Sequence, residues 1–149
     1  MATANDPRDE RVGPSTADSP TDPPDLAVRV GTDLLGLVVQ QRANGVCVLA
    51  VDGELDALTA PLLGACLREQ FVANPVHVIV DLQAVCFLGS SGLNCLLEAR
   101  EIAQQVPGMH LHLAGLATRA VARPLEVTGL LERFDTYPTL ADALTALAE

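Results

Sequence analysis

The chain contains no lysine and no tryptophan, and its 149 residues include only one tyrosine and three phenylalanines. Without lysine it can form neither a phosphate-binding P-loop nor a Schiff base with a carbonyl substrate. A phosphoacceptor receiver domain, which uses a lysine near its aspartate, is disfavoured for the same reason. With so few aromatic side chains, the core must consist mainly of leucine, valine, isoleucine and alanine.

Positive charge is also scarce, since nine arginines oppose 19 acidic residues and the formal net charge is −10. Nucleic-acid backbones and anionic membranes are bound by clustered basic residues, so neither is expected as a partner. No apolar run approaches the ~20 residues that cross a bilayer. The first residues lack the apolar stretch of a signal peptide. We therefore expect a cytoplasmic protein.

The four cysteines include no Cys-x-x-Cys pair and no Cys/His pair at the spacing of metal ligands. We therefore expect no metal site, and nothing in the sequence indicates a cofactor. In the cytoplasm these thiols are expected to be reduced and mostly buried. Cys86 and Cys95 flank one segment, and we note them as a candidate redox pair.

Residues 1–32 differ in composition from the rest. Five of the ten prolines lie in the first 24 positions, and six acids against three arginines give this segment a charge of −3. Such a segment cannot bury enough apolar surface to offset its chain entropy. We predict that residues 1–32 form a disordered, acidic, proline-rich leader, of which 26–30 could fold onto the domain.

From residue 33 onward, short apolar runs alternate with helical patterns. The two runs before the first helix are separated by Asn44-Gly45, a tight-turn signal, and should form an antiparallel hairpin. Later strands are joined by helices, which implies parallel pairing. Strands are predicted at 34–40, 46–51, 76–80, 109–114 and 134–137, and helices at about 59–73, 93–106, 118–130 and 140–148. The sequence thus predicts one α/β domain over 33–149, with a mostly parallel sheet of about five strands and about four helices.

One segment, Gly89-Ser-Ser-Gly92, combines small residues with hydroxyls directly before a helix. Serine is a favoured helix N-cap, which needs no further role. A nucleophile elbow requires Gly-x-Ser-x-Gly, so this motif is one residue too short, and we expect no enzyme activity. The three histidines have no evident relation to the serines. Two uses remain open: the helix N-terminus could bind a nucleotide or other anion, or a serine could be phosphorylated there.

Several motifs in this order resemble the STAS domain, and more narrowly the bacterial anti-sigma factor antagonists. They are Val51-Asp-Gly-Glu-Leu-Asp56, Thr59-Ala-Pro, and Asp81-Leu with the later Phe87-Leu-Gly-Ser-Ser-Gly-Leu93. The resemblance covers roughly residues 33–149 and agrees with the predicted order of elements. It implies a regulator of transcription that binds a partner protein and is not itself an enzyme.

The resemblance also implies the site. In that family the first serine of this step accepts phosphate from an anti-sigma factor that is a serine kinase, which points to Ser90, with Ser91 as the neighbouring alternative. A phosphatase is implied as a second partner. Asp56 matches an acidic residue near the phosphoacceptor, although it could equally cap the following helix. Gly89 departs from the family, where aspartate is common.

The resemblance further implies a partner switch. The unphosphorylated protein binds the anti-sigma factor through a surface that includes Asp56, Gly89, Ser91, Gly92 and Leu93, and phosphate on Ser90 weakens that binding. The acidity of the domain predicts a basic docking face on the partner. Two alternatives stay open: an unphosphorylated STAS scaffold subunit, in a lipid-transport ATPase complex or a stress-signalling assembly, and a nucleotide- or anion-binding module.

Overall fold

The computed structural model describes residues 27–31 and 34–148, and the first 26 residues of the expected leader lie outside that description. A single six-stranded sheet forms the centre of the molecule, in the order β2-β3-β4-β5-β6-β7. Its strands are β2 (Ala27–Gly31), β3 (Leu35–Arg42), β4 (Val46–Leu55), β5 (His77–Leu88), β6 (His110–Ala114) and β7 (Asp135–Tyr137). The helices are α2 (Ala60–Val72), α3 (Ser90–Gln104), α4 (Arg119–Val127) and α5 (Leu140–Leu147).

The predicted topology is confirmed. Strands β3 and β4 pair antiparallel, and β4, β5, β6 and β7 pair parallel with one another. The hairpin turn uses left-handed backbone at Asn44 and Gly45, with φ of 67° and 75°. Those are the two residues that the Asn-Gly signal placed there.

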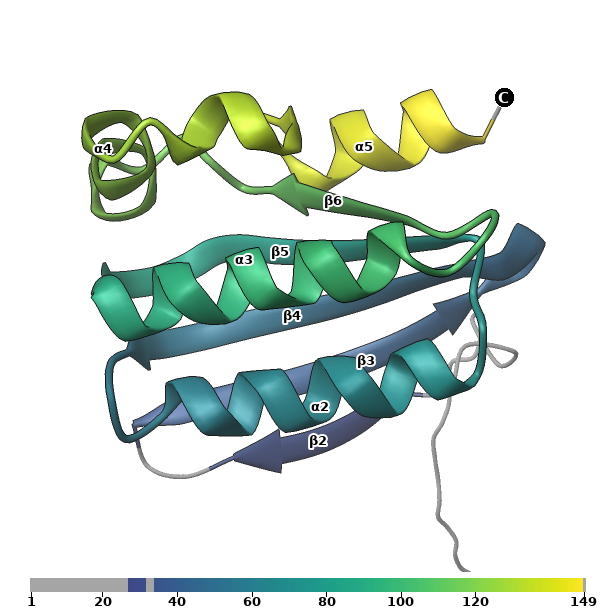
Figure 1. Ribbon diagram of the computed structural model, residues 1–149, viewed down its shortest axis with the longest axis horizontal. Coiled ribbons are helices and arrows are strands. Elements are labelled where there is room, and N and C mark those ends of the chain that lie inside the picture. Colours follow the sequence, from purple (N-terminus) through teal and green to yellow (C-terminus); the bar gives the residue numbers. More distant parts are fainter. Residues whose placement is uncertain (1–26, 32–33, 149) are drawn as a thin grey trace, which may run out of the picture.

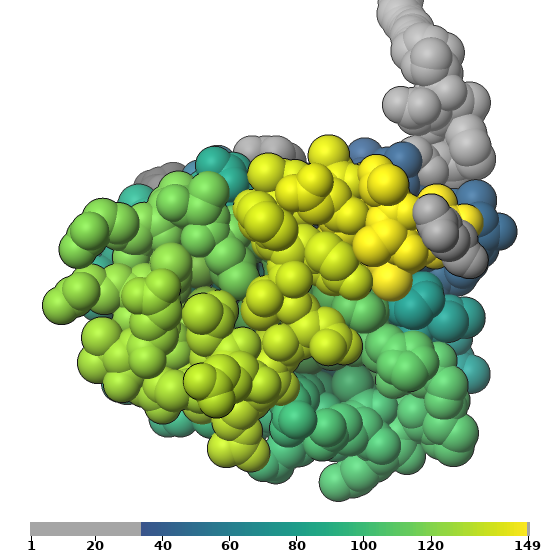
Figure 2. All heavy atoms as spheres, turned by 90° about the horizontal axis from the view of Figure 1, so that it is seen from above, coloured from purple at the N-terminus to yellow at the C-terminus, as the bar shows by residue number. Residues whose placement is uncertain are grey.

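Two apolar layers hold the helices against the sheet. Helices α2 and α3 lie side by side on one face (Figure 1), and Val121 and Leu125 of α4 join the same core. On the other face Ala143 of α5 packs in a smaller cluster with Val48 and Ile79. Figure 2 shows the molecule from above, where the C-terminal part of the chain from α4 to α5 forms much of the visible surface.

The sheet has one strand more than the five expected, because β2 lies inside the segment assigned to the leader. It pairs antiparallel with β3, with Ala27 opposite Gln40 and Gly31 opposite Gly36. The backbone ladder therefore begins at residue 27, ahead of the domain boundary predicted at residue 33. Strand β2 overlaps residues 26–30, the part of the segment that the sequence allowed to fold onto the domain.

Strand β5 was predicted to end near Asp81 but continues to Leu88. Its second half pairs with the end of β4 after register shifts, so that Asp52 lies opposite Ala84 and Leu55 opposite Leu88. These irregularities break the alternation of buried and exposed residues, and period-two reasoning could not find this half. Residues 52–55, expected in a loop, are consequently strand.

The observed helix boundaries differ from the predicted ones by a few residues. Helix α3 begins at Ser90 instead of residue 93, because Gly89 in extended conformation already serves as N-cap. The predicted helix 118–130 is divided: α4 ends at Val127, Gly129 adopts a left-handed φ of 74°, and a 3-10 turn follows at Leu130–Arg133. A left-handed glycine is a common helix terminator.

Candidate functional site

The Gly-Ser-Ser-Gly segment lies at the carboxyl ends of two neighbouring parallel strands. The last residues of β4 and β5, Leu55 and Leu88, are opposite each other in the ladder. The amide of Gly89 then donates to the Leu55 carbonyl at 2.9 Å. The turn after β4 and the start of α3 are therefore fixed to one another.

Ser90 and Ser91 occupy the first two positions of α3. Ser90 is exposed and Ser91 is half-buried. No side chain caps this helix start within the described residues. A phosphoryl group on Ser90 would thus lie next to unpaired amides and the positive end of the helix dipole, which stabilise a dianion. Of the two serines, Ser90 is the more exposed to solvent.

The two glycines differ in role. An added Cβ at Gly89 would meet the Phe87 ring at 3.0 Å, whereas at Gly92 it would lie 2.8 Å from Leu88 Cδ1 and 2.9 Å from Leu55 Cβ. Gly92 is therefore a close-packing position. Gly92 and Leu93 are buried and seat α3 on the sheet, and contact of these two residues with a partner stays a prediction.

The Asp56 carboxylate closes the turn that leads into α2, whose N-cap residue is Thr59. Asp56 Oδ1 accepts the amides of Leu58 and Thr59, both at 3.0 Å, and the Asp56 amide donates to Thr59 Oγ1 at 2.9 Å. The bond from the Thr59 amide is the main cause that lowers the pKa of this carboxyl below its ordinary value. Of the two roles considered for Asp56, the one at the start of α2 is the one with direct geometry, and its carboxylate also lies on the turn beside Gly89.

Two exposed apolar side chains flank the site, and sequence reasoning missed both. Phe87, which precedes Leu88 at the end of β5, is 51% exposed, and Leu58 in the turn after β4 is 79% exposed. No period in the sequence marked Phe87, because the register shifts between β4 and β5 break the alternation of buried and exposed residues in this half of the strand. Exposed aromatic and aliphatic groups at a site are typical anchors of a protein interface.

A groove between α2 and α3 opens next to the serines. Its volume is about 390 Å³, and Ser91 and Asn94 line it from α3 while Pro61, Gly64 and Arg68 line it from α2. Small side chains keep it open near Ser91, and Arg68 adds a positive group farther along. The Ser90 surface therefore combines a hydroxyl, apolar anchors and a concave strip.

The candidate redox pair is not brought together by a bond. Cys86 is exposed, with its thiol 3.5 Å from the Gly53 carbonyl, and Cys95 is buried, with its thiol 3.5 Å from the Ala60 carbonyl. Burial raises the pKa of Cys95 to about 11. A thiol of that kind supplies little thiolate near pH 7 and attacks disulfides slowly.

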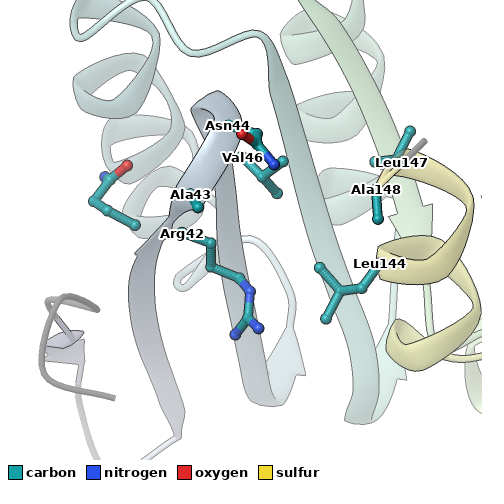
Figure 3. Close-up of a pocket in the computed structure, with 8 residues that line it drawn as sticks. Arg42, Ala43, Asn44, Val46, Leu144, Leu147 and Ala148 are labelled. Atoms are coloured by element: carbon teal, nitrogen blue, oxygen red, sulfur yellow. The ribbon is translucent and has the colours of Figure 1, made fainter. Parts of the chain in front are cut away.

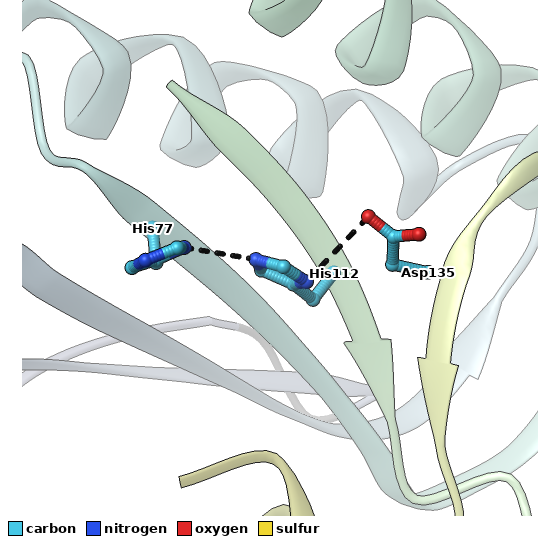
Figure 4. A network of polar contacts seen from close by, with 3 residues as sticks. All are labelled: His77, His112 and Asp135. Carbon is cyan, nitrogen blue, oxygen red and sulfur yellow. Dashed lines mark hydrogen bonds and ion pairs between the residues drawn. The ribbon is translucent and has the colours of Figure 1, made fainter. Parts of the chain in front are cut away.

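The three histidines gather on the start of β5 and β6, far along the sheet from Ser90. His77 Nδ1 lies 3.0 Å from His112 Nε2, and His112 Nδ1 lies 3.9 Å from Asp135 Oδ2 (Figure 4). His110 stacks on His77 with ring centroids 5.5 Å apart. His112 is 4% exposed, and burial is the main cause that lowers its pKa to about 4. His112 is thus neutral near pH 7, and its contact with His77 is structural.

A cavity beside the hairpin turn is also remote from Ser90. It has a volume of about 480 Å³ and lies between the hairpin turn and the end of α5, with Arg42, Asn44 and Val46 facing Leu144 and Leu147 (Figure 3). Within residues 27–31 and 34–148, no cluster of histidine, cysteine, aspartate or glutamate could hold a metal ion. No helix in the same residues is long and apolar enough to cross a membrane.

Comparisons with known proteins agree on one family. The family model for the STAS domain matches residues 38–143. The anti-sigma-F factor antagonist RsfB of Mycobacterium tuberculosis is 39% identical over 104 residues, which cover 70% of this chain and 83% of the relative.

Solved structures agree with this match. An anti-sigma factor antagonist from Mycobacterium paratuberculosis is 36% identical, with a TM-score of 0.68 over 80% of this chain and 98% of its own. The antagonist SpoIIAA, solved in its unphosphorylated form, shares the fold at 18% identity, with a TM-score of 0.63 over 75% of this chain and 96% of its own.

Proposed function

Because this chain belongs to the STAS domain family, we propose that it is an anti-sigma factor antagonist whose binding to an anti-sigma factor is switched by phosphorylation of Ser90. The observation that carries the proposal is the exposed Ser90 hydroxyl at the open N-terminus of α3, on a surface with unpartnered apolar anchors. The relative RsfB and the structural neighbour from Mycobacterium paratuberculosis, both named as antagonists, support the same assignment.

The binding surface is formed by the turn after β4 and the start of α3. Leu58 in the turn after β4 and Phe87 at the end of β5 supply exposed apolar area, and the α2–α3 groove accepts a side chain of the partner. Asp52 is exposed on β4 and Asp56 lies on the turn, so this end of the molecule is acidic. The complementary face on the anti-sigma factor is therefore basic and apolar.

The switch follows from electrostatics. Phosphate adds a charge of about −1.5 to −2 at pH 7. The isolated domain tolerates that charge at the α3 N-terminus, where the amides and helix dipole stabilise it. In the complex the same dianion must be desolvated beside existing carboxylates, which weakens binding without any change of fold. A loss of ~3 kcal/mol corresponds to about a hundredfold weaker affinity.

Chemistry on Ser90 comes from the partners. The anti-sigma factor, as a serine kinase, transfers the phosphoryl group from ATP to Ser90 Oγ, and a phosphatase removes it. This chain contributes the acceptor hydroxyl and its exposure. Gly89 places no carboxylate before Ser90, so it adds no repulsion to the incoming phosphoryl group.

The experiment combines intact-mass analysis with binding. With ATP, Mg²⁺ and the cognate anti-sigma kinase, the wild-type chain gains one phosphate and Ser90→Ala gains none. Ser90→Ala binds the anti-sigma factor like wild type, whereas Ser90→Glu binds far more weakly in calorimetry. Thr145→Glu, which adds the same charge on exposed α5, is the matched control and leaves affinity unchanged.

Two results would overturn the proposal. Phosphate on Ser90→Ala would move the acceptor to another hydroxyl, with Ser91 the first to examine. Equal affinities of Ser90→Ala and Ser90→Glu would remove the switch and favour a scaffold subunit that is never phosphorylated.

A further inference from the structure

A separate cavity lies at the end of the sheet opposite Ser90, where β6 and β7 begin. Its volume is about 250 Å³, and it is lined by the last turn of α3 and the first residues of β6 and β7. Helix α3 spans 15 residues from Ser90 to Gln104. At 1.5 Å per residue the cavity lies roughly 20 Å from the phosphoacceptor. Its role is therefore independent of the proposed switch.

The cavity has an apolar floor and a polar rim. The floor consists of buried side chains that belong to the main core: Ala103, Met109, Leu111 and Phe134. The rim carries hydrogen-bonding groups from four elements, α3, β6, the 3-10 turn at Leu130–Arg133 and β7: Arg100, Gln104, His110, Arg133 and Asp135. The floor cannot bind polar ligands, so the rim decides which ligand fits.

The charge of this rim is unusual for the molecule. Residues 34–148 contain six arginines and eleven acidic residues. Two of those arginines but only one acid line the cavity. The acids next to these arginines in sequence, Glu101 and Glu132, do not line it. A small basic recess thus exists on an otherwise acidic protein.

The guanidinium groups are available for a ligand. The Arg133 side chain makes no hydrogen bond or ion pair with any residue that the structure describes. Arg100 Nη1 donates only to Gln104 Oε1, at a long 3.4 Å. The one acid of the rim, Asp135, has a carboxylate oxygen directed toward His112 (Figure 4).

We propose that this cavity binds a small phosphate group, either inorganic phosphate or a phosphate monoester. Two arginines from different elements present planar forks of donors that match a tetrahedral oxyanion, which a single arginine does less well. A volume of 250 Å³ equals roughly eight water molecules at ~30 Å³ each. It holds a phosphate with a few attached carbons and is too small for a nucleotide.

Opposing groups set the expected affinity. The last carbonyls of α3 form the negative end of its dipole, and Asp135 adds a carboxylate. The two arginines attract a phosphate, whereas the α3 carbonyls and Asp135 repel it. The affinity for phosphate is therefore modest, and it falls as the salt concentration increases. We expect dissociation constants on the order of millimolar, about −4 kcal/mol.

The test is a titration of the full chain followed by amide NMR at constant ionic strength, with inorganic phosphate and with glycerol 3-phosphate as probes. Both probes produce saturable shifts in amides near residues 100–104, 109–111 and 133–135. Arg100→Gln and Arg133→Gln each weaken binding at least tenfold, which is about 1.4 kcal/mol. Arg68→Gln, which removes an exposed arginine outside the cavity, is the matched control and keeps wild-type affinity.

Circular dichroism verifies that each variant is folded. The proposal is overturned if neither probe gives a saturable shift, if the double variant Arg100→Gln/Arg133→Gln binds like wild type, or if the shifts centre on Ser90 instead.

Discussion

Replacing Gly92 by alanine tests whether close packing fixes the start of α3. The new Cβ would lie 2.8 Å from Leu88 Cδ1, 2.9 Å from Leu55 Cβ and 3.3 Å from the Leu55 carbonyl. Leu55 and Leu88 are 0% and 4% exposed, so neither can move aside without disturbing the core. Overpacking of this kind costs about 1–3 kcal/mol.

A gain in helix propensity offsets part of that cost. Alanine is better than glycine inside a helix by up to about 1 kcal/mol. For Gly92→Ala we therefore expect a net loss of about 1–2 kcal/mol in the free energy of unfolding, because the overpacking cost exceeds the propensity gain.

Gly64→Ala in α2 supplies the matched control. Its Cβ would meet the mobile end of exposed Arg68 at 3.3 Å and Cys95 Sγ at an ordinary 3.5 Å. There the propensity gain should prevail, and stability should stay equal or rise by up to about 1 kcal/mol.

Urea unfolding followed by circular dichroism measures both variants against wild type, with equal m-values as the condition for comparing them. The reasoning is refuted if Gly92→Ala proves as stable as Gly64→Ala. A destabilised Gly92→Ala should also bind the anti-sigma factor more weakly, since Ser90 and Ser91 move with the first turn of α3.

Two further predictions concern groups remote from Ser90. Burial holds the pKa of His112 near 4, against an ordinary 6.5. As the pH drops from about 6.5 toward 4, the unfolded chain therefore takes up a proton that the folded chain does not, and the free energy of unfolding falls. His112 contributes at most about 1.4 kcal/mol per pH unit to this fall. In His112→Gln, thermal melts across that range should show a flatter profile, and an unchanged profile would contradict the assignment. Of the four thiols, only Cys86 is exposed, so a thiol reagent should label one site rapidly in the native protein and none in Cys86→Ser. Mild oxidation should leave no disulfide between Cys86 and Cys95; an intact mass lower by two hydrogen atoms, with a peptide map that joins these two residues, would contradict this prediction.

The fold was largely predictable because its local signals are strong. The Asn44-Gly45 turn, the β-branched run at 76–80 and the Thr139 cap of α5 each fix one element, and Thr139 Oγ1 does accept the Asp142 amide at 3.0 Å. What failed depended on tertiary contacts. The second half of β5 is strand only because β4 supplies its partner, and the bulges between them leave no period in the sequence.

The position of the candidate site was predictable from the sequence, but which of its residues are exposed was not. The Gly-Ser-Ser-Gly motif located the phosphoacceptor candidate, and its place beside Asp56 follows from parallel pairing of β4 and β5. Sequence could not separate glycines that contact a partner from glycines that allow packing, because that depends on the Leu55 and Leu88 side chains opposite. The exposure of Leu58 likewise depends on the path of the turn after β4, which the sequence does not show.

The direction of the hairpin has a practical consequence for experiments on this protein. Ala27 lies opposite Gln40 near the hairpin turn, and Leu147 near the end of α5 lines the cavity beside that same turn. Ala27 and Leu147 therefore both lie at the end of the sheet away from Ser90. Immobilising the chain through a tag before residue 27 or after residue 148 should leave the surface around Ser90 accessible to the anti-sigma factor. Sensor-chip measurements with the two tags should therefore give the same affinity for the anti-sigma factor.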